Sequence, residues 1–164
     1  MTTVLAGHIA PKFFLNGVGG KSFLLEAALK KGPVVAAFFK ITCPVCQFTF
    51  PFLERLHKAY GGERVNLVGI SQDDARDTRE FCEEYDITFP TVVDEDGYPV
   101  SNQYGLTNVP TVLLINPDGK VAVSSMGFSK ADLEEINAAL ARAAGRAPAP
   151  LFRPDEVVPD YKPG

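Results

Sequence analysis

The apolar residues of this chain form short continuous runs and helical repeats that follow one another regularly. Residues 34–39 are Val-Val-Ala-Ala-Phe-Phe and residues 111–115 are Thr-Val-Leu-Leu-Ile. A run that is this short and does not alternate is typical of a strand buried on both faces. We predict a further buried strand over residues 65–70 and a short extended piece over residues 89–93. Residues 121–126 show the alternation of a half-exposed strand.

Helical patterns lie between these strands. Pro44 suits the first turn of a helix, because an N–H has no partner there and its loss costs nothing. Apolar residues then recur at helical spacing until Gly61-Gly62, namely Phe48, Phe52, Leu53, Leu56 and Tyr60. The other predicted helices cover residues 22–30, 77–85 and 129–144, and the serine at the start of the first and of the last is the expected cap.

Strands alternate with helices until a pair of strands near the end of the chain. This order predicts an α/β fold with a mixed central sheet flanked by helices, parallel in its first half and antiparallel in its second. A strand over residues 10–15 and the Asn16-Gly17 turn predict a hairpin extension at the N-terminus. We expect one domain over residues 1–144. Residues 145–164 carry five prolines and are expected to form an extended tail without regular structure.

Composition and charge exclude several classes of partner. The chain has 164 residues and a formal net charge of −4, and its basic residues are scattered. Nucleic acid is therefore not an expected partner, because phosphate binding needs a concentrated basic face. The acidic stretch at residues 73–84 is expected to be a solvated helix face.

The start of the chain lacks a cationic segment followed by an apolar one, and the sequence has no run of about 18 apolar residues. We therefore expect neither a signal peptide nor a membrane span, and a cytoplasmic location. The oligomeric state is not indicated by any pattern in the sequence.

The candidate for chemistry is the motif Cys43-Pro44-Val45-Cys46, which follows a predicted buried strand and begins a predicted helix. The free N–H groups and positive end of a helix favour a nucleophilic thiolate at that place. Cys46 lies one turn later, within reach of the Cys43 sulfur, and we expect it to be deeper, with a higher pKa. The pattern predicts that Cys43 attacks a disulfide and that Cys46 resolves the mixed disulfide.

Other interpretations of these motifs are weaker. Zinc usually needs four ligands, and the sequence has no second Cys-x-x-Cys pair and no paired histidines. Inert core cysteines are possible but do not explain the strand–motif–helix setting. Residues 17–22 lack the first glycine of a phosphate-binding loop, because Leu15 stands at that position, and they are predicted to form a turn and a cap. We expect neither a metal nor a cofactor.

Several motifs in order resemble the thioredoxin-like redoxin family that includes TlpA- and ResA-type reductases and is related to the AhpC/TSA peroxiredoxins. The resemblance covers about residues 7–143. It rests on Ala10-Pro11-x-Phe13, Gly20-Lys21, the Cys43–Cys46 motif, Phe89-Pro90, Asp94-x-x-Gly97, Tyr104-Gly105, Val109-Pro110-Thr111 and residues 115–120 (Ile-Asn-Pro-Asp-Gly-Lys). It implies a thiol–disulfide oxidoreductase that acts on protein thiols and disulfides, together with an unidentified electron donor or acceptor.

The resemblance also implies that Pro110 is cis and faces the redox pair. The backbone of Val109 is then free to pair with an extended substrate, and the residues between the cysteines, Pro44 and Val45, are further expected substrate contacts. One of the aromatic residues Phe48, Phe50 and Phe52 is expected to line the groove around Cys43.

This sequence departs from the family pattern at three positions. Thr42 stands where thioredoxins usually have Trp, Ala37 where they have a buried Asp, and Thr49 where ResA-like proteins have Glu. Such carboxylates assist proton transfer from the resolving thiol. Thr42 and Lys40 are possible modulators of the Cys43 thiolate, and a solvated loop cation is an equally good interpretation of Lys40.

Two alternative functions remain open on sequence alone. A peroxiredoxin-like peroxidase would need the motif Pro-x-x-x-Thr-x-x-Cys, but Ala36 and Lys40 stand at the Pro and Thr positions. The second alternative function is a redox-responsive binding module that catalyses no reaction. Cys82 is expected to be a small buried apolar residue, with a role as a third redox thiol as its alternative. The direction of the reaction is not indicated.

Overall fold

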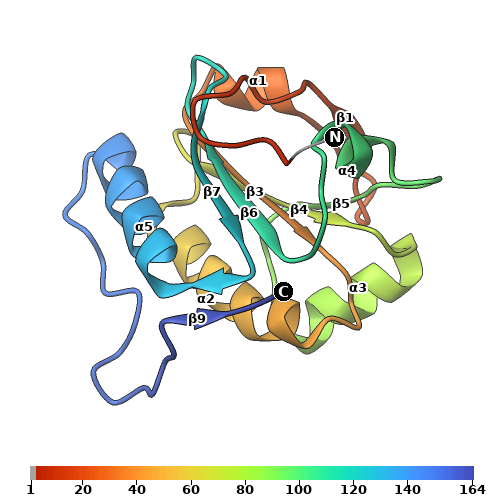
Figure 1. Ribbon diagram of the computed structural model, residues 1–164. Coiled ribbons are helices and arrows are strands. Elements are labelled where there is room, and N and C mark those ends of the chain that lie inside the picture. Colours follow the sequence, from red (N-terminus) through yellow and green to blue (C-terminus); the bar gives the residue numbers. More distant parts are fainter. Residues whose placement is uncertain (1–2) are drawn as a thin grey trace.

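The computed structural model describes residues 3–164. Its centre is a five-stranded sheet in the order β5-β4-β3-β6-β7 (Figure 1). Strands β3, β4 and β5 are parallel, β6 is antiparallel to β3, and β7 is antiparallel to β6. The predicted mixed sheet, parallel and then antiparallel, is therefore confirmed. The strands are β3 (Val34–Phe39), β4 (Asn66–Ser71), β5 (Thr91–Val93), β6 (Thr111–Ile115) and β7 (Val121–Met126).

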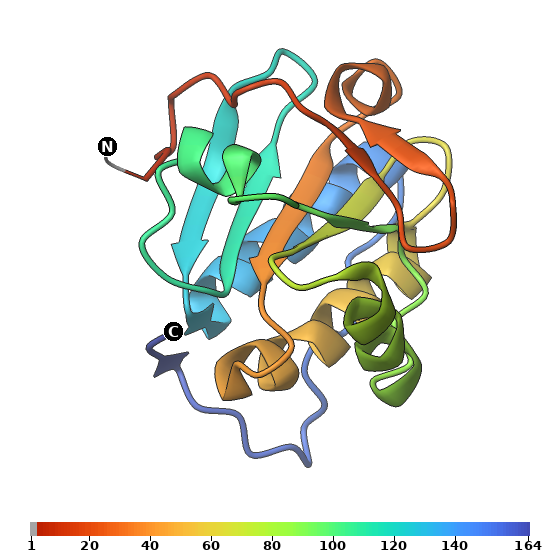
Figure 2. The ribbon, with the colours of Figure 1, turned by 90° about the vertical axis from the view of Figure 1, so that its right-hand side faces the viewer.

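Both faces of the sheet are covered, as Figure 2 shows. Helices α2 (Pro44–Tyr60), α3 (Ala75–Glu84) and α5 (Lys130–Ala144) cover one face. The N-terminal segment, α1 (Leu25–Leu29) and α4 (Pro99–Gln103) cover the other. Every residue of β3 is at most 1% exposed, because alternate side chains enter two separate cores. This explains the continuous apolar run in the sequence.

The N-terminal hairpin forms, but with different boundaries and a different turn. It pairs β1 (Phe14–Asn16) with β2 (Ser22–Leu24), leaving a five-residue loop in which Gly20 has a φ of +89°. The predicted Asn16-Gly17 turn and the Ser22 helix cap are therefore wrong. Ser22 belongs to a strand because Phe23 is buried opposite Leu15, and α1 begins later without a side-chain cap.

Helix α4 was not expected from the sequence. Asp94, fully buried, accepts hydrogen bonds from the backbone N–H groups of Val100 and Ser101 at 3.0 and 2.7 Å, and from the Ser101 hydroxyl at 2.7 Å. A five-residue helix is too short to show a helical repeat, so contacts of this kind decide whether it forms.

Residues 145–164 pack against α5 and α2 and then run back to strand β8 (Figure 1). We call this segment the C-terminal strap. Leu151 is only 4% exposed, and strand β9 (Tyr161–Lys162) pairs with β8 (Phe128–Ser129). The proline content predicted no regular structure in this segment, and β9 is a correction to that expectation.

Within residues 3–164, no helix combines the length and the apolar composition that crossing a membrane requires.

Candidate redox site at the start of α2

Cys43 lies at the N-terminus of α2, four residues beyond the buried end of β3. It is the N-cap residue, with extended backbone angles, and its sulfur accepts a hydrogen bond from the Cys46 N–H at 3.1 Å. The Cys43 side chain is half-buried, so a substrate sulfur can approach it. This hydrogen bond fixes the position of the Cys43 sulfur at the start of the helix.

Cys46 faces the interior and is fully buried. Burial, and to a smaller extent the neighbouring Cys43 sulfur, raises the pKa of the Cys46 thiol. Cys46 is therefore held as a thiol at neutral pH, whereas Cys43 is accessible. The difference in depth that was expected from one helical turn is present.

The loop between β3 and α2 is held by polar contacts that the sequence analysis missed. The Asp73 carboxylate accepts the Ile41 N–H at 2.8 Å, and the Gln47 side-chain amide donates to the Ile41 carbonyl at 2.8 Å. Asp73 lies between β4 and α3 rather than on a solvated helix face. The signal was its position just after β4, because the carboxyl ends of neighbouring parallel strands meet at one edge of the sheet.

A second loop faces Cys43 from the start of β6. The Val109–Pro110 peptide bond is cis, as the resemblance implies. The Cys43 thiol donates a hydrogen bond to the Val109 carbonyl at 3.6 Å, which places this loop directly beside the nucleophile. Thr111 supports the loop by donating from its hydroxyl to the Asn108 carbonyl at 2.8 Å.

The other candidate residues surround this pair. Pro44 and Thr42 are exposed and Val45 is half-buried. Lys40 is exposed and lines a cavity of about 230 Å³ together with Val109, Gln72, Tyr98 and Ser101. The cavity is a polar hollow beside the cis-proline loop.

The positions where relatives carry carboxylates are buried and uncharged here. Thr49 is fully buried and donates from its hydroxyl to the Val45 carbonyl at 2.7 Å, and Ala37 is 1% exposed. Neither side chain can accept a proton from Cys46, so that proton must leave by another route.

The aromatic residues after the motif divide between core and surface. Phe50 and Phe52 are buried, whereas Phe48 is partly exposed and packs edge-on against Phe52 and Phe128. Of the three, Phe48 is therefore the one that can line the groove expected around Cys43.

Cys82 lies on a different helix from the redox pair. It is partly buried on α3, and its thiol contacts the Thr91 hydroxyl at 3.6 Å. Burial raises the pKa of Cys82, which disfavours a reactive thiolate there.

Comparison with known proteins agrees with this geometry. The model of the AhpC/TSA family matches residues 6–124. Thiol-disulfide oxidoreductase ResA of Halalkalibacterium halodurans is 31% identical over 133 residues, which cover 80% of this chain and 74% of that protein. Among solved structures, a Chlorobium tepidum protein provisionally identified as thiol:disulfide interchange protein DsbE is similar with a TM-score of 0.75. It is 26% identical and covers 87% of this chain and 100% of its own.

A peroxidoxin, BcpB of Mycobacterium tuberculosis, shares the fold with a TM-score of 0.71 and 26% identity, over 85% of this chain and 97% of its own. The fold thus occurs both in a thiol:disulfide interchange protein and in a peroxidoxin. The fold and these relatives show that the chain is a thioredoxin-like thiol–disulfide oxidoreductase. The chain belongs to the AhpC/TSA family and, within it, is related to the ResA-type oxidoreductases.

Proposed function

We propose that this protein exchanges a Cys43–Cys46 disulfide or dithiol with protein substrates, with Cys43 as the nucleophile and Cys46 as the resolving thiol. The observation that carries the proposal is the placement of the Cys43 sulfur between the Cys46 N–H and the Val109 carbonyl, with the Cys46 sulfur buried behind it. Only one of the two sulfurs can meet a large substrate.

In the reducing direction, the Cys43 thiolate attacks one sulfur of a substrate disulfide. The substrate S–S bond breaks, a mixed disulfide forms, and the departing sulfur takes up a proton. The Cys46 thiolate then attacks the Cys43 sulfur, forming the Cys43–Cys46 disulfide and releasing the second substrate thiol. Two electrons pass from the pair to the substrate, and the reverse steps oxidise a substrate dithiol.

We propose that Val109, Pro110, Pro44 and Val45 form the contact surface for an extended protein segment. The exposed Pro44 and the backbone beside the cis bond support this assignment. The electron donor or acceptor is unidentified, and the cytoplasmic location expected from the sequence stays a prediction.

A peroxidase is the second candidate, favoured by the shared fold of the peroxidoxin. This chain does not have the peroxidatic motif Pro-x-x-x-Thr-x-x-Cys, because Lys40 stands at the position of its threonine. Consumption of hydrogen peroxide by Cys43 far faster than by free cysteine would favour the peroxidase instead.

The test is reduction of a model protein disulfide such as insulin, followed by trapping. Cys43→Ser is expected to abolish activity, because the accessible nucleophile is lost. Cys46→Ser is expected to stop after the first step and accumulate a mixed disulfide, seen as a mass increase equal to the substrate.

Cys82→Ser is the matched control, because it removes a third thiol that lies outside the pair. It is expected to retain activity and to trap nothing. A Cys46→Ser variant that forms no mixed disulfide, together with a parent protein that reduces neither insulin nor a small disulfide, would contradict the proposed function.

A further inference from the structure

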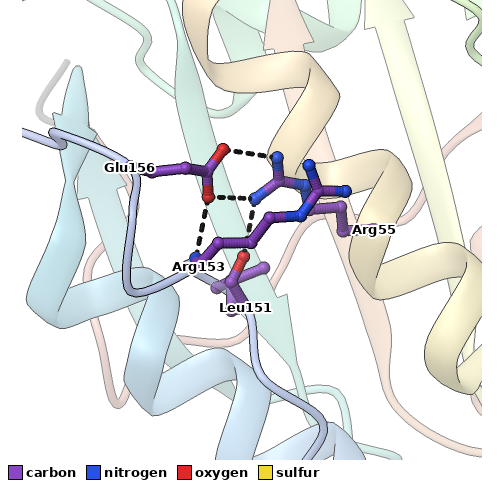
Figure 3. A network of polar contacts seen from close by, with 4 residues as sticks. All are labelled: Arg55, Leu151, Arg153 and Glu156. Carbon is purple, nitrogen blue, oxygen red and sulfur yellow. Dashed lines mark hydrogen bonds and ion pairs between the residues drawn. The ribbon is translucent and has the colours of Figure 1, made fainter.

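The C-terminal strap is held on α2 by a network of charged and backbone groups (Figure 3). The Arg55 guanidinium donates two hydrogen bonds to the Glu156 carboxylate at 2.8 and 2.7 Å and a third to the Leu151 carbonyl at 2.9 Å. The same carboxylate accepts the Arg153 N–H at 2.8 Å. A bidentate pair of this kind fixes geometry as well as charge.

Apolar packing joins this network. Phe152 packs against Phe52 and Phe128 with ring centroids 5.0 and 6.3 Å apart. Upstream, the Tyr60 hydroxyl accepts the Ala149 N–H at 2.7 Å. The strap is therefore attached along much of its length before it reaches the redox site.

The last four described residues, 161–164, are the strap end. Strand β9 pairs with β8, and the Lys162 ammonium lies 4.8 Å from the centroid of the Phe48 ring. Gly127 touches the same segment so closely that a Cβ there would collide with the Lys162 carbonyl and lie 2.9 Å from the Gly164 nitrogen. The strap end is thus packed closely against the loop between β7 and β8.

The strap end also reaches the carbonyl that contacts Cys43. A Cβ built on Gly164 would collide with the Val109 carbonyl oxygen and lie 3.2 Å from the Asn108 side-chain nitrogen. The Cys43 thiol donates to this same Val109 oxygen. Two features of the proposed substrate groove, the Val109 backbone and the Phe48 ring, are therefore already in contact with the strap end.

We infer that residues 161–164 occupy the protein-substrate groove as an internal competitor, so that the strap end must leave before an extended substrate binds beside Val109. The inference rests on the proposed function of Cys43. The strap end should block large substrates alone, because a small disulfide needs to reach only the half-buried Cys43 sulfur. It also indicates the chemistry that the groove accepts, namely an extended segment with a cation over Phe48 and a small residue at Val109.

The test compares two oxidants, insulin and a small aromatic disulfide such as Ellman's reagent, on the parent protein and three variants of it. A chain that ends at Asp160 lacks the strap end but keeps the attached part of the strap. It is expected to react with insulin about tenfold faster than the parent. In the parent, only the minor fraction of molecules with the strap end released can bind insulin, whereas the groove of the shortened chain is always open. Its rate with the small disulfide is expected to be unchanged.

Glu156→Gln keeps the whole chain and removes the charge that Arg55 binds. It is expected to raise the insulin rate about two- to fivefold, in the range that a partly exposed ion pair supports. Asp155→Asn is the matched control, because Asp155 is an exposed carboxylate of the same strap that makes no ion pair within residues 3–164. It is expected to behave like the parent.

An amidated peptide with the sequence of residues 160–164 gives a measurement that does not depend on the stability of the shortened chain. It is expected to slow the reaction of insulin with the shortened chain and to have little effect on the parent. Equal insulin rates for the parent, the shortened chain and Glu156→Gln would overturn the inference and leave the proposed function intact. Loss of reaction with both oxidants in the parent would instead overturn the proposed function.

Discussion

Cys43 and Cys46 have the same side chain and lie three residues apart, yet the fold gives them different chemistry. Cys43 ends a loop at the surface, where the N–H of Cys46 points at its sulfur. Cys46 points inward and is itself 0% exposed. The difference arises because Cys43 is the N-cap residue, with extended backbone angles at the exposed end of α2, whereas Cys46 lies one turn further along, on the helix face that packs into the core.

The burial of Cys46 makes the second step of the reaction dependent on pH. Its pKa is raised, so only a small fraction is thiolate at neutral pH. The decay of a mixed disulfide on Cys43 is therefore expected to accelerate about tenfold per pH unit between pH 6 and 9, since the thiolate is the attacking form. Rapid acid quenching followed by mass analysis measures this rate. A rate that is flat over the same range would show that another group removes the Cys46 proton.

At the scale of elements, the redox site depends on three segments that are distant in the sequence. The β3–α2 loop is held by Asp73 after β4, and the cis-proline loop precedes β6. Helix α4 joins them from the opposite side, because Gln72 donates from its side chain to the Ser101 hydroxyl at 3.0 Å. The polar cavity beside Val109 is thus bounded by elements that have no shared local pattern.

Asp94→Ala is expected to lower the free energy of unfolding by about 2 to 4 kcal/mol, because two buried backbone N–H groups of α4 lose their acceptor. Chemical denaturation measures the change. Asp96→Ala, an exposed position on the adjacent turn, is the control and is expected to change stability little. Equal midpoints for the two variants would contradict the role of Asp94.

At the scale of the whole molecule, the chain folds back on itself so that its last described residues meet the site formed by residues 40–46 and 109–110. The sequence pattern predicts the sheet and its helices without reference to this contact. The strap adds a connection between the far end of α2 and the cis-proline loop, through the Arg55–Glu156 pair at one end and β9 at the other.

The strap is expected to loosen in acid. Arg55 lowers the pKa of Glu156 to about 2, so the ion pair contributes stability above the ordinary carboxyl pKa of 4.5. This contribution is lost as the pH falls from that value towards 2, because protonation then removes the charge. Amide hydrogen-exchange protection of residues 149–162, measured relative to β3, should fall between pH 5 and pH 2.5. Glu156→Gln should show the lower protection at both pH values, and a protection that is independent of pH in the parent would contradict this role of the pair.

Much of the fold could be predicted because it follows from local patterns. The continuous run in β3 and the repeat in α2 each identify an element without reference to the rest of the chain. The Ser22 cap failed because a capping residue type is equally suited to a strand when Phe23 has a partner to bury against. Helix α4 was missed because the buried Asp94 that holds it lies outside the helix.

The sequence by itself determined the redox motif, the order of the five central strands and of the long helices, and the resemblance that implied a cis bond at Pro110. Those features depend on neighbouring residues and on short-range spacing. Only the tertiary structure decided that Asp73 holds the loop before Cys43, that Lys162 lies over the Phe48 ring, and that Gly164 meets Val109. These contacts join residues dozens of positions apart, and their partners are selected by packing and by the pairing of buried polar groups, which no local pattern records.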